Sequence, residues 1–318
     1  MSIYFFIKKT LTSSIFTIFI ICLTNTGYSQ NINGPRLDNL ISIGDSAFEA
    51  RAYNNAIEYY SQALIINPYN ADLYFKRAES FYNLGNYNQS IYDYSQAIKL
   101  NPTFYNAYIK RGSAYYNIED YNKSIADFTS AINLNKNDYV PYYNRAYSYM
   151  KIGNYQKAID DYTRTLQLDP NFANAYINRG ISYIYIDNFN SAIKDLTQAA
   201  SLSPESPVIY YYRGRAFYKT ENMNQALSDL SYAIYLLPQY ADAYVVRGTV
   251  YLSLNNYSKA IDDFTSAISI NPHDAEAYNN RGIAYKKIGR GDLAMEDFNK
   301  ACQYDRNLCT LNQILLNI

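Results

Sequence analysis

The sequence predicts an all-α solenoid, a stack of helical hairpins, and three regularities support this prediction. Prolines recur at a spacing of 34 residues or twice that value. Small residues stand at fixed places between them, and apolar residues follow the period of an α-helix. Such a fixed period is the signature of a repeat architecture, in which each hairpin buries its faces against its neighbours. The prolines are Pro68, Pro102, Pro170, Pro204, Pro238 and Pro272.

Eight repeats of 34 residues run in phase over residues 37–308 without an insertion. In the seventh repeat, a helical stripe that contains Tyr244 and Tyr251 precedes a polar break at Asn255, and a second stripe follows. Pro272 ends that stripe because proline restricts the residue before it and has no N–H to donate. Each repeat is therefore predicted to hold two helices. The repeats begin at Leu37, Ala71, Tyr105, Tyr139, Ala173, Pro207, Ala241 and Ala275.

Two places in every repeat carry small residues, counting places from the first residue of the repeat. The twentieth place is always Ala or Ser, and in most repeats a Tyr or Phe stands four residues later. These residues predict close approach of the two helices, with the ring filling the remaining gap. The last place of four repeats predicts a helix cap, at Asn70, Asp138, Ser206 and Asp274. The eighth places are Gly44, Ala78, Gly112, Ala146, Gly180, Gly214, Gly248 and Gly282.

Taken together, these places resemble the tetratricopeptide repeat. The resemblance covers 272 of the 318 residues, and eight copies in phase make it specific. It implies a right-handed superhelix with a concave groove lined by the first helix of each hairpin, and binding of a peptide or protein in that groove. The departures are few: Lys136 and Arg306 replace the last proline, Thr165 replaces an alanine, and the first repeat has Leu40 and Ala47 in place of aromatic residues.

An Arg and an Asp recur together in repeats two to eight, at the seventh and twenty-third places. The first repeat lacks both and has Ile43 and Tyr59 instead, which favours pairing within a repeat. We therefore predict a ladder of partly buried ion pairs. The alternative is a basic strip that contacts phosphate. The expected pairs are Arg77 with Asp93, Arg111 with Asp127, Arg145 with Asp161, Arg179 with Asp195, Arg213 with Asp229, Arg247 with Asp263 and Arg281 with Asp297.

The second, fifth, ninth and twelfth places share one face of the first helix, and the resemblance makes this face the groove. The face is more apolar than a solvated surface requires. About half of these side chains are expected to pack between adjacent first helices and the rest to form an aromatic binding surface. The predicted groove residues are Phe75, Tyr82, Ile109, Tyr116, Tyr143, Tyr147, Met150, Ile177, Ile181, Ile184, Tyr211, Arg215 and Tyr218.

Charge along this face predicts a gradient from acidic early repeats to basic late repeats. A ligand of opposite charge polarity would be oriented by it. The alternative is scattered surface charge without function. The acidic residues are Asp38, Asp45, Glu49, Asp72 and Glu79. The basic ones are Arg215, Lys219, Lys286 and Lys287.

The first 29 residues have the layout of a secretory signal peptide. Lys8 and Lys9 precede an apolar run over 11–23, and the small residues Gly27 and Ser29 follow. We expect cleavage before Gln30, followed by a short linker over 30–36. The mature chain is expected to have no membrane span and to reside in the periplasm, on the outer side of the envelope or outside the cell. An uncleaved anchor is the alternative.

The C-terminal end carries two further expectations. Residues 309–318 have helical spacing and are predicted to cap the last hairpin. Cys302 and Cys309 either form a disulfide, which export permits, or pack as two small apolar residues.

Several function classes lack support in the sequence. The chain has 28 basic and 28 acidic residues, whereas nucleic-acid binders usually carry a basic excess. Its only histidine, His273, lies in a connection, and no metal spacing or glycine-rich phosphate loop occurs. Asp160 and Asp161 are adjacent on a helix and therefore point apart. We expect no catalysis, cofactor or metal. The sequence predicts an exported scaffold that binds a peptide or protein; the alternative is an envelope chaperone or regulatory adaptor that holds exported clients transiently.

Overall fold

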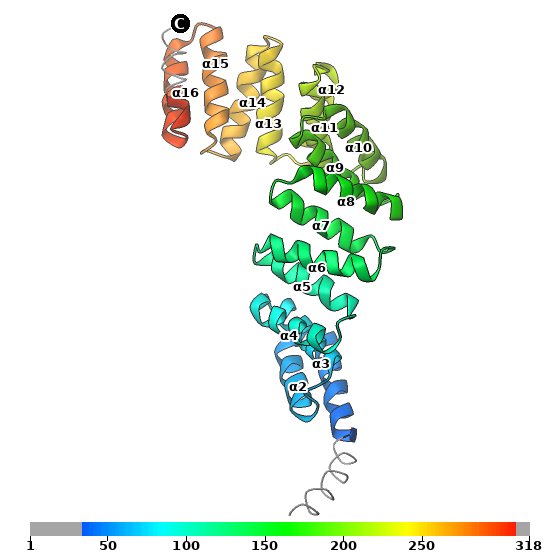
Figure 1. Cartoon of the computed structure of the whole chain (residues 1–318). Helices are drawn as coiled ribbons and strands as arrows, with labels where there is room; N and C mark the ends of the chain where they lie inside the picture. The colour runs from blue at the N-terminus through cyan, green and yellow to red at the C-terminus, as the bar shows by residue number, and fades with distance from the viewer. Residues whose placement is uncertain (1–33, 310–318) are drawn as a thin grey trace, which may run out of the picture. The chain divides into compact units, whose positions relative to one another are not determined.

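The computed structural model describes residues 34–309, and all of the regular structure within this range is helical (Figure 1). The chain divides into two compact parts. The N-terminal segment reaches to Lys136 and holds repeats one to three. The C-terminal segment starts at Asn137 and holds repeats four to eight. The predicted all-α repeat architecture is confirmed.

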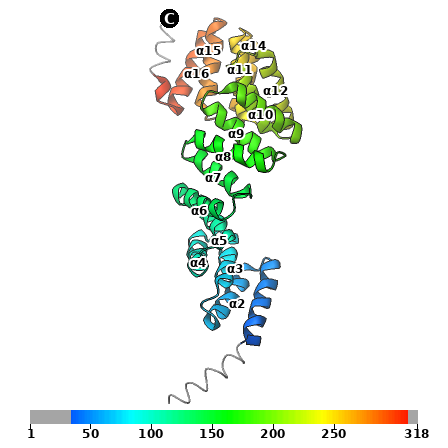
Figure 2. The ribbon, with the colours of Figure 1, turned by 45° about the vertical axis from the view of Figure 1, so that its right-hand side comes forward.

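Within each segment, consecutive helices pair as antiparallel hairpins, and each hairpin packs on the next (Figure 2). A helix over residues 34–49 is the first helix of repeat one. The other first helices are α3 (Ala71–Asn83), α5 (Tyr105–Asn117), α7 (Val140–Lys151), α9 (Ala173–Tyr185), α11 (Pro207–Lys219), α13 (Ala241–Ser253) and α15 (Ala275–Lys287). The second helices are α2 (Tyr53–Ile66), α4 (Tyr87–Leu100), α6 (Tyr121–Leu134), α8 (Tyr155–Leu168), α10 (Phe189–Leu202), α12 (Met223–Leu236), α14 (Tyr257–Ile270) and α16 (Gly291–Tyr304).

The turn inside each hairpin has one backbone conformation. The fifteenth place of every repeat has a positive φ, whether it is a glycine such as Gly85 (77°) or a residue with a side chain such as Asp187 (57°). The next N–H then bonds back to the eleventh place, as Asn86 does to the carbonyl of Phe81 at 2.9 Å. This is the left-handed helix termination that satisfies the last carbonyls of a helix. It turns the chain sharply enough to place both helices side by side.

The two helices of a hairpin meet at the small residue of the eighth place. In repeat seven, a Cβ atom added to Gly248 would lie 2.7 Å from the Phe264 ring, which is itself fully buried. The ring at the twenty-fourth place thus fills the space that the missing side chain leaves, as the sequence predicted. Repeats five and six use Leu196 and Leu230 in the same way.

The predicted helix caps are only partly correct. Asn70 and Asp274 accept cap bonds from the backbone N–H groups of Leu73 and Ala277. The Ser206 side chain makes no such bond, because the N–H of Ile209 is already bonded to the Ser206 carbonyl oxygen. Asp138 accepts from the N–H of Val140 instead, and α7 begins one residue later than the repeat does.

The predicted terminal segments lie mostly outside the described residues. The signal peptide over 1–29, most of the linker over 30–36 and nearly all of the capping segment over 309–318 belong to this part of the chain. Cys302 and Cys309 do form a disulfide, with Cα atoms 4.6 Å apart, so the bridged alternative holds. Among residues 34–309, no helix has the length and hydropathy needed to cross a membrane.

Candidate partner-binding groove

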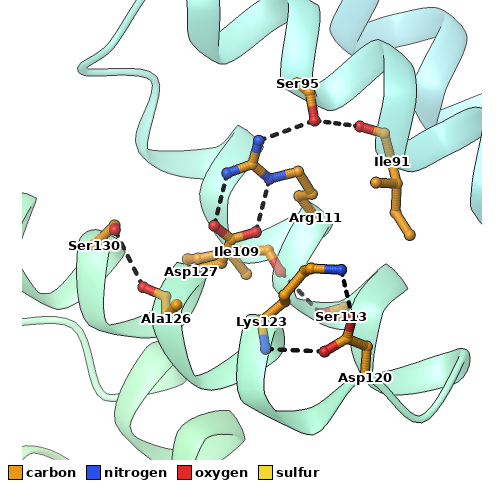
Figure 3. Close-up of polar contacts among 10 residues, drawn as sticks. All are labelled: Ile91, Ser95, Ile109, Arg111, Ser113, Asp120, Lys123, Ala126, Asp127 and Ser130. Carbon is orange, nitrogen blue, oxygen red and sulfur yellow. Dashed lines mark hydrogen bonds and ion pairs between the residues drawn. The ribbon is translucent and has the colours of Figure 1, made fainter.

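Seven bidentate ion pairs fix the relative positions of the helices that carry the groove. Arg111 donates from Nε and Nη2 to the two carboxylate oxygens of Asp127, at 2.7 Å each (Figure 3). The same geometry recurs in every other repeat from two to eight, so the pairing is within a repeat, as the sequence analysis favoured. The other pairs are Arg77–Asp93, Arg145–Asp161, Arg179–Asp195, Arg213–Asp229, Arg247–Asp263 and Arg281–Asp297.

A hydroxyl from the preceding repeat completes this arrangement, and the sequence analysis missed it. Arg111 Nη1 donates to Ser95 Oγ at 2.9 Å, and that hydroxyl donates to the carbonyl oxygen of Ile91 (Figure 3). The twenty-fifth place is Ser or Thr in repeats one to seven, so the signal was present in the sequence. The arginine therefore ties adjacent hairpins together. The same bond joins Arg77 to Ser61, Arg179 to Thr163, Arg213 to Thr197, Arg247 to Ser231 and Arg281 to Thr265.

The surroundings of the pairs account for their structural role. Each of the seven guanidinium groups lies 5.4–5.9 Å from the ring of the tyrosine three residues earlier, as Arg77 does from Tyr74. Burial raises the pKa of the Asp93 and Asp127 carboxyls even though each faces an arginine. These carboxyls thus carry a desolvation cost. Burial also acts to lower the pKa of Arg77 and Arg111, but the aspartates raise it above its usual value, so burial opposes the attraction within each pair. Their donors are engaged within the protein, so these arginines do not form a strip available to phosphate.

A groove of about 590 Å³ opens on the first-helix face of repeats five to eight. Its wall is formed by the C-terminal end of α9 with the turn into α10, by residues of α11 and α13, and by the connection before α15 with the start of that helix. The second, fifth, ninth and twelfth places supply much of it, which is the face that helical geometry indicated. The lining residues are Ile184, Tyr185, Asp187, Phe189, Tyr211, Arg215, Tyr218, Lys219, Asp242, Val245, Val246, Thr249, Asp274 and Glu276.

Two tyrosines form the aromatic part of this groove. The Tyr211 ring packs 4.9 Å from that of Tyr240, and burial, aided by the nearby Asp242, raises the pKa of its hydroxyl to about 12. Tyr218 is half-buried, and its hydroxyl is 3.0 Å from Ser253 Oγ. Tyr211 is thus fixed by the core, whereas the ring of Tyr218 keeps a surface open to an occupant.

Arg215 is the central cation of the groove. Its guanidinium lies 5.6 Å from the ring centroids of both Tyr211 and Tyr212, and it forms no ion pair among the described residues. Solvent reaches the Glu276 carboxyl, but the groove walls remove much of its hydration and thereby raise its pKa. Asp274 and Asp242 raise this pKa further, and Arg215 opposes them.

The predicted groove residues fall into three classes of exposure. Ile177, Ile181, Ile184 and Tyr211 are buried where α9, α11 and their neighbours pack, which is a smaller share of the set than the half that was expected. Tyr147 is 37% exposed and does not line the groove of repeats five to eight. Those that line it are Ile184, Tyr211, Arg215 and Tyr218. The half-buried members are Phe75, Tyr82, Ile109, Tyr116, Tyr143, Met150, Arg215 and Tyr218.

The predicted charge gradient is wrong for the late repeats. Arg215 and Lys219 do line the groove, but Lys286 and Lys287 do not, and four carboxylates accompany the two cations. Asp242 and Glu276 occupy the second place of their repeats, the same place as the acidic Asp38 and Asp72 of the early repeats. The sequence therefore contained these second-place acidic residues of the late repeats, but the predicted gradient took account only of those in the early repeats.

Comparison with known families agrees with this geometry. Three profiles are described as "Tetratricopeptide repeat": the first matches residues 139–172 and 275–308, the second matches 105–138, and the third matches 177–243. A fourth profile, described as "TPR repeat", matches residues 78–119 and 248–289. The chain is a tetratricopeptide repeat protein. No curated protein matches its sequence significantly.

Solved structures of other tetratricopeptide repeat proteins share the fold. One from Cytophaga hutchinsonii has a TM-score of 0.64 at 16% identity, and one from Parabacteroides merdae has 0.62 at 19%. Each alignment covers 76% of this chain and 98% of the other. YrrB, described as a tetratricopeptide repeat protein with an unusual peptide-binding site, has a TM-score of 0.51 at 25% identity, with 60% of this chain and 98% of YrrB covered.

Proposed function

We propose that this tetratricopeptide repeat protein is a non-catalytic scaffold that binds a peptide or protein in the groove of repeats five to eight. The observation that carries the proposal is the groove itself, a volume of about 590 Å³ whose wall contains the half-buried Tyr218 and Arg215, a cation that forms no ion pair among the described residues. Aromatic and arginine side chains are the residue types that dominate the energetics of protein interfaces. The likeness to YrrB, whose description names a peptide-binding site, supports the same class of ligand.

Two features of residues 34–309 bear on the non-catalytic part of the proposal. Within residues 34–309, no group of His, Cys, Asp and Glu side chains has the arrangement of a metal site. The seven buried aspartates of the ladder are each bonded to an arginine, which leaves them as structural groups rather than acids or bases poised for reaction.

Replacing Tyr218 with alanine is expected to weaken partner binding by about 1–3 kcal/mol, because an aromatic anchor is removed from the groove wall. Tyr218 and Tyr183 are both half-buried and pack against the same core, so both replacements should lower stability. Tyr183 does not line the groove, so Tyr183→Ala should leave partner binding unchanged. The measurement is the melting temperature and calorimetric affinity of both variants, with a partner captured from an envelope extract of the native host.

Capture of partners from the envelope extract also distinguishes a scaffold from a chaperone or regulatory adaptor. One partner at fixed stoichiometry supports the scaffold, whereas a changing set of unfolded clients supports an envelope chaperone or regulatory adaptor. A Tyr218→Ala variant that binds as tightly as the unchanged protein, together with a Tyr183→Ala variant that is stable but does not bind, would place the binding site on the other helix face.

We also propose that the protein is exported to the periplasm, the outer side of the envelope or the medium. The basic, apolar and small residues of the first 29 positions support this, as does the Cys302–Cys309 disulfide, since disulfides persist in oxidising compartments. Mass spectrometry of protein isolated from the native host is expected to show an N-terminus at or near Gln30. Recovery of intact Met1 in a membrane fraction would show an uncleaved anchor instead.

A further inference from the structure

We propose that the groove of repeats five to eight selects a basic peptide segment, whose Lys or Arg side chain enters between Asp242, Asp274 and Glu276. This inference rests on the proposed function and names the chemistry of the partner. The acidic residues come from α13, α15 and the connection before α15, and the aromatic residues Tyr211 and Tyr218 come from α11.

Charge complementarity is the first argument. The groove is lined by the carboxylates of Asp187, Asp242, Asp274 and Glu276 against the cations of Arg215 and Lys219. Asp242 and Glu276 form no ion pair among the described residues, unlike the ladder aspartates of the same segment, which all do. Burial, followed by the charges of Asp274 and Asp242, raises the pKa of Glu276, and Arg215 opposes this shift. A cationic side chain relieves this repulsion.

The aromatic residues suit the same ligand. Arg215 lies over Tyr211 and Tyr212 at 5.6 Å, so Tyr218 is the lining ring of α11 that a ligand can contact. The open ring of Tyr218 and the aliphatic Val246 provide apolar surface for the stem of a Lys or Arg and for apolar residues beside it. The occupant is therefore a short extended segment with one basic residue between apolar ones.

The probes are three acetylated and amidated peptides of sequence Gly-Leu-X-Leu-Gly, in which X is arginine, norleucine or glutamate. Dissociation constants are measured by NMR titration of the full chain. We expect the arginine peptide to bind at least about fivefold more tightly than the norleucine peptide and the glutamate peptide to bind most weakly. The affinity for the arginine peptide should fall as salt is added, because the contact involves partly exposed charges.

The decisive variant is Asp242→Asn combined with Glu276→Gln, which removes two charges without changing side-chain size. Affinity for the arginine peptide is expected to fall about tenfold. The matched control is Asp160→Asn with Asp262→Asn, two exposed carboxylates on second helices outside the groove, and it should bind as the unchanged protein does.

Three outcomes overturn the inference: equal or tighter binding of the glutamate peptide, no saturable binding of the arginine peptide, or an unchanged affinity in the Asp242→Asn, Glu276→Gln variant. The glutamate result would assign the groove to an acidic segment held by Arg215 and Lys219. If a captured partner still loses affinity with Tyr218→Ala but not with the double charge variant, the groove binds a partner and only its basic preference is wrong.

Discussion

Phe264→Ala is expected to lower the free energy of unfolding by about 3–5 kcal/mol, the largest effect among the stability changes considered for this chain. The Phe264 ring is fully buried at the closest approach of α13 and α14. Its neighbour across the interface is Gly248, which has no side chain to move into the vacated space. The cavity therefore persists, and the cost includes both the lost apolar burial and the empty volume. Urea denaturation followed by circular dichroism measures it.

The effect of Gly248→Ala on the free energy of unfolding should change sign with the residue at position 264. In the unchanged protein the new methyl group would lie 2.7 Å from the ring, so Gly248→Ala should be destabilising by about 1–2 kcal/mol. In the Phe264→Ala background the clash is gone, and the higher helix propensity of alanine makes the same change neutral or stabilising. Tyr235→Ala, at a ring that is 77% exposed, is the control and should cost less than about 0.5 kcal/mol. A loss below about 1 kcal/mol in Phe264→Ala would contradict this account of the packing.

Arg179→Ala is expected to cost about 3 kcal/mol of unfolding free energy, because it leaves the buried carboxylate of Asp195 without a partner. Arg179 donates to the two oxygens of Asp195 at 2.6 and 2.8 Å and to Thr163 of the preceding repeat at 2.9 Å. Asp195 is 4% exposed, so water does not replace the lost bonds.

A double-mutant cycle apportions this loss. Coupling between Arg179→Ala and Asp195→Ala should be about 2 kcal/mol, and coupling to Thr163→Ala about 0.5–1 kcal/mol, since that bond is to a neutral hydroxyl. Coupling to Asp161, which is paired with Arg145, should be close to zero. A coupling to Asp161 larger than that to Asp195 would mean that the pairs in solution form between repeats rather than within them.

The fold was predictable from the sequence because the two helices of each repeat pack closely through the same kinds of residues at the same places. The small eighth place and the ring at the twenty-fourth recur so often that one hairpin explains the others. The ladder was equally visible, since Ile43 and Tyr59 replace both partners together in the first repeat. The Ser or Thr at the twenty-fifth place recurs as regularly, but its partner lies in the next repeat, and spacing within one repeat does not indicate that contact.

The groove was less predictable because its walls combine several repeats. Helical spacing placed Tyr211, Arg215 and Tyr218 on the correct face, but it did not show which side chains the adjacent helix covers. Ile177 and Ile181 lie on that face and are nonetheless buried by packing. Asp274 belongs to the connection before α15 and caps that helix, so a rule that considers only first-helix faces does not include it. The spacing rule includes Asp242 and Glu276, which occupy second places, whereas the contribution of Asp274 emerged only from the structure.

The groove assignment is tested most directly by mapping where a bound partner contacts the chain. A photo-crosslinking amino acid is introduced in place of Val246 in the groove, and separately in place of Tyr235 on the exposed surface of α12. The account predicts covalent adducts with a protein or peptide at position 246 that disappear when Tyr218→Ala is added, and none at position 235. Adducts at position 235 with none at position 246 would contradict the assignment of partner binding to the groove of repeats five to eight.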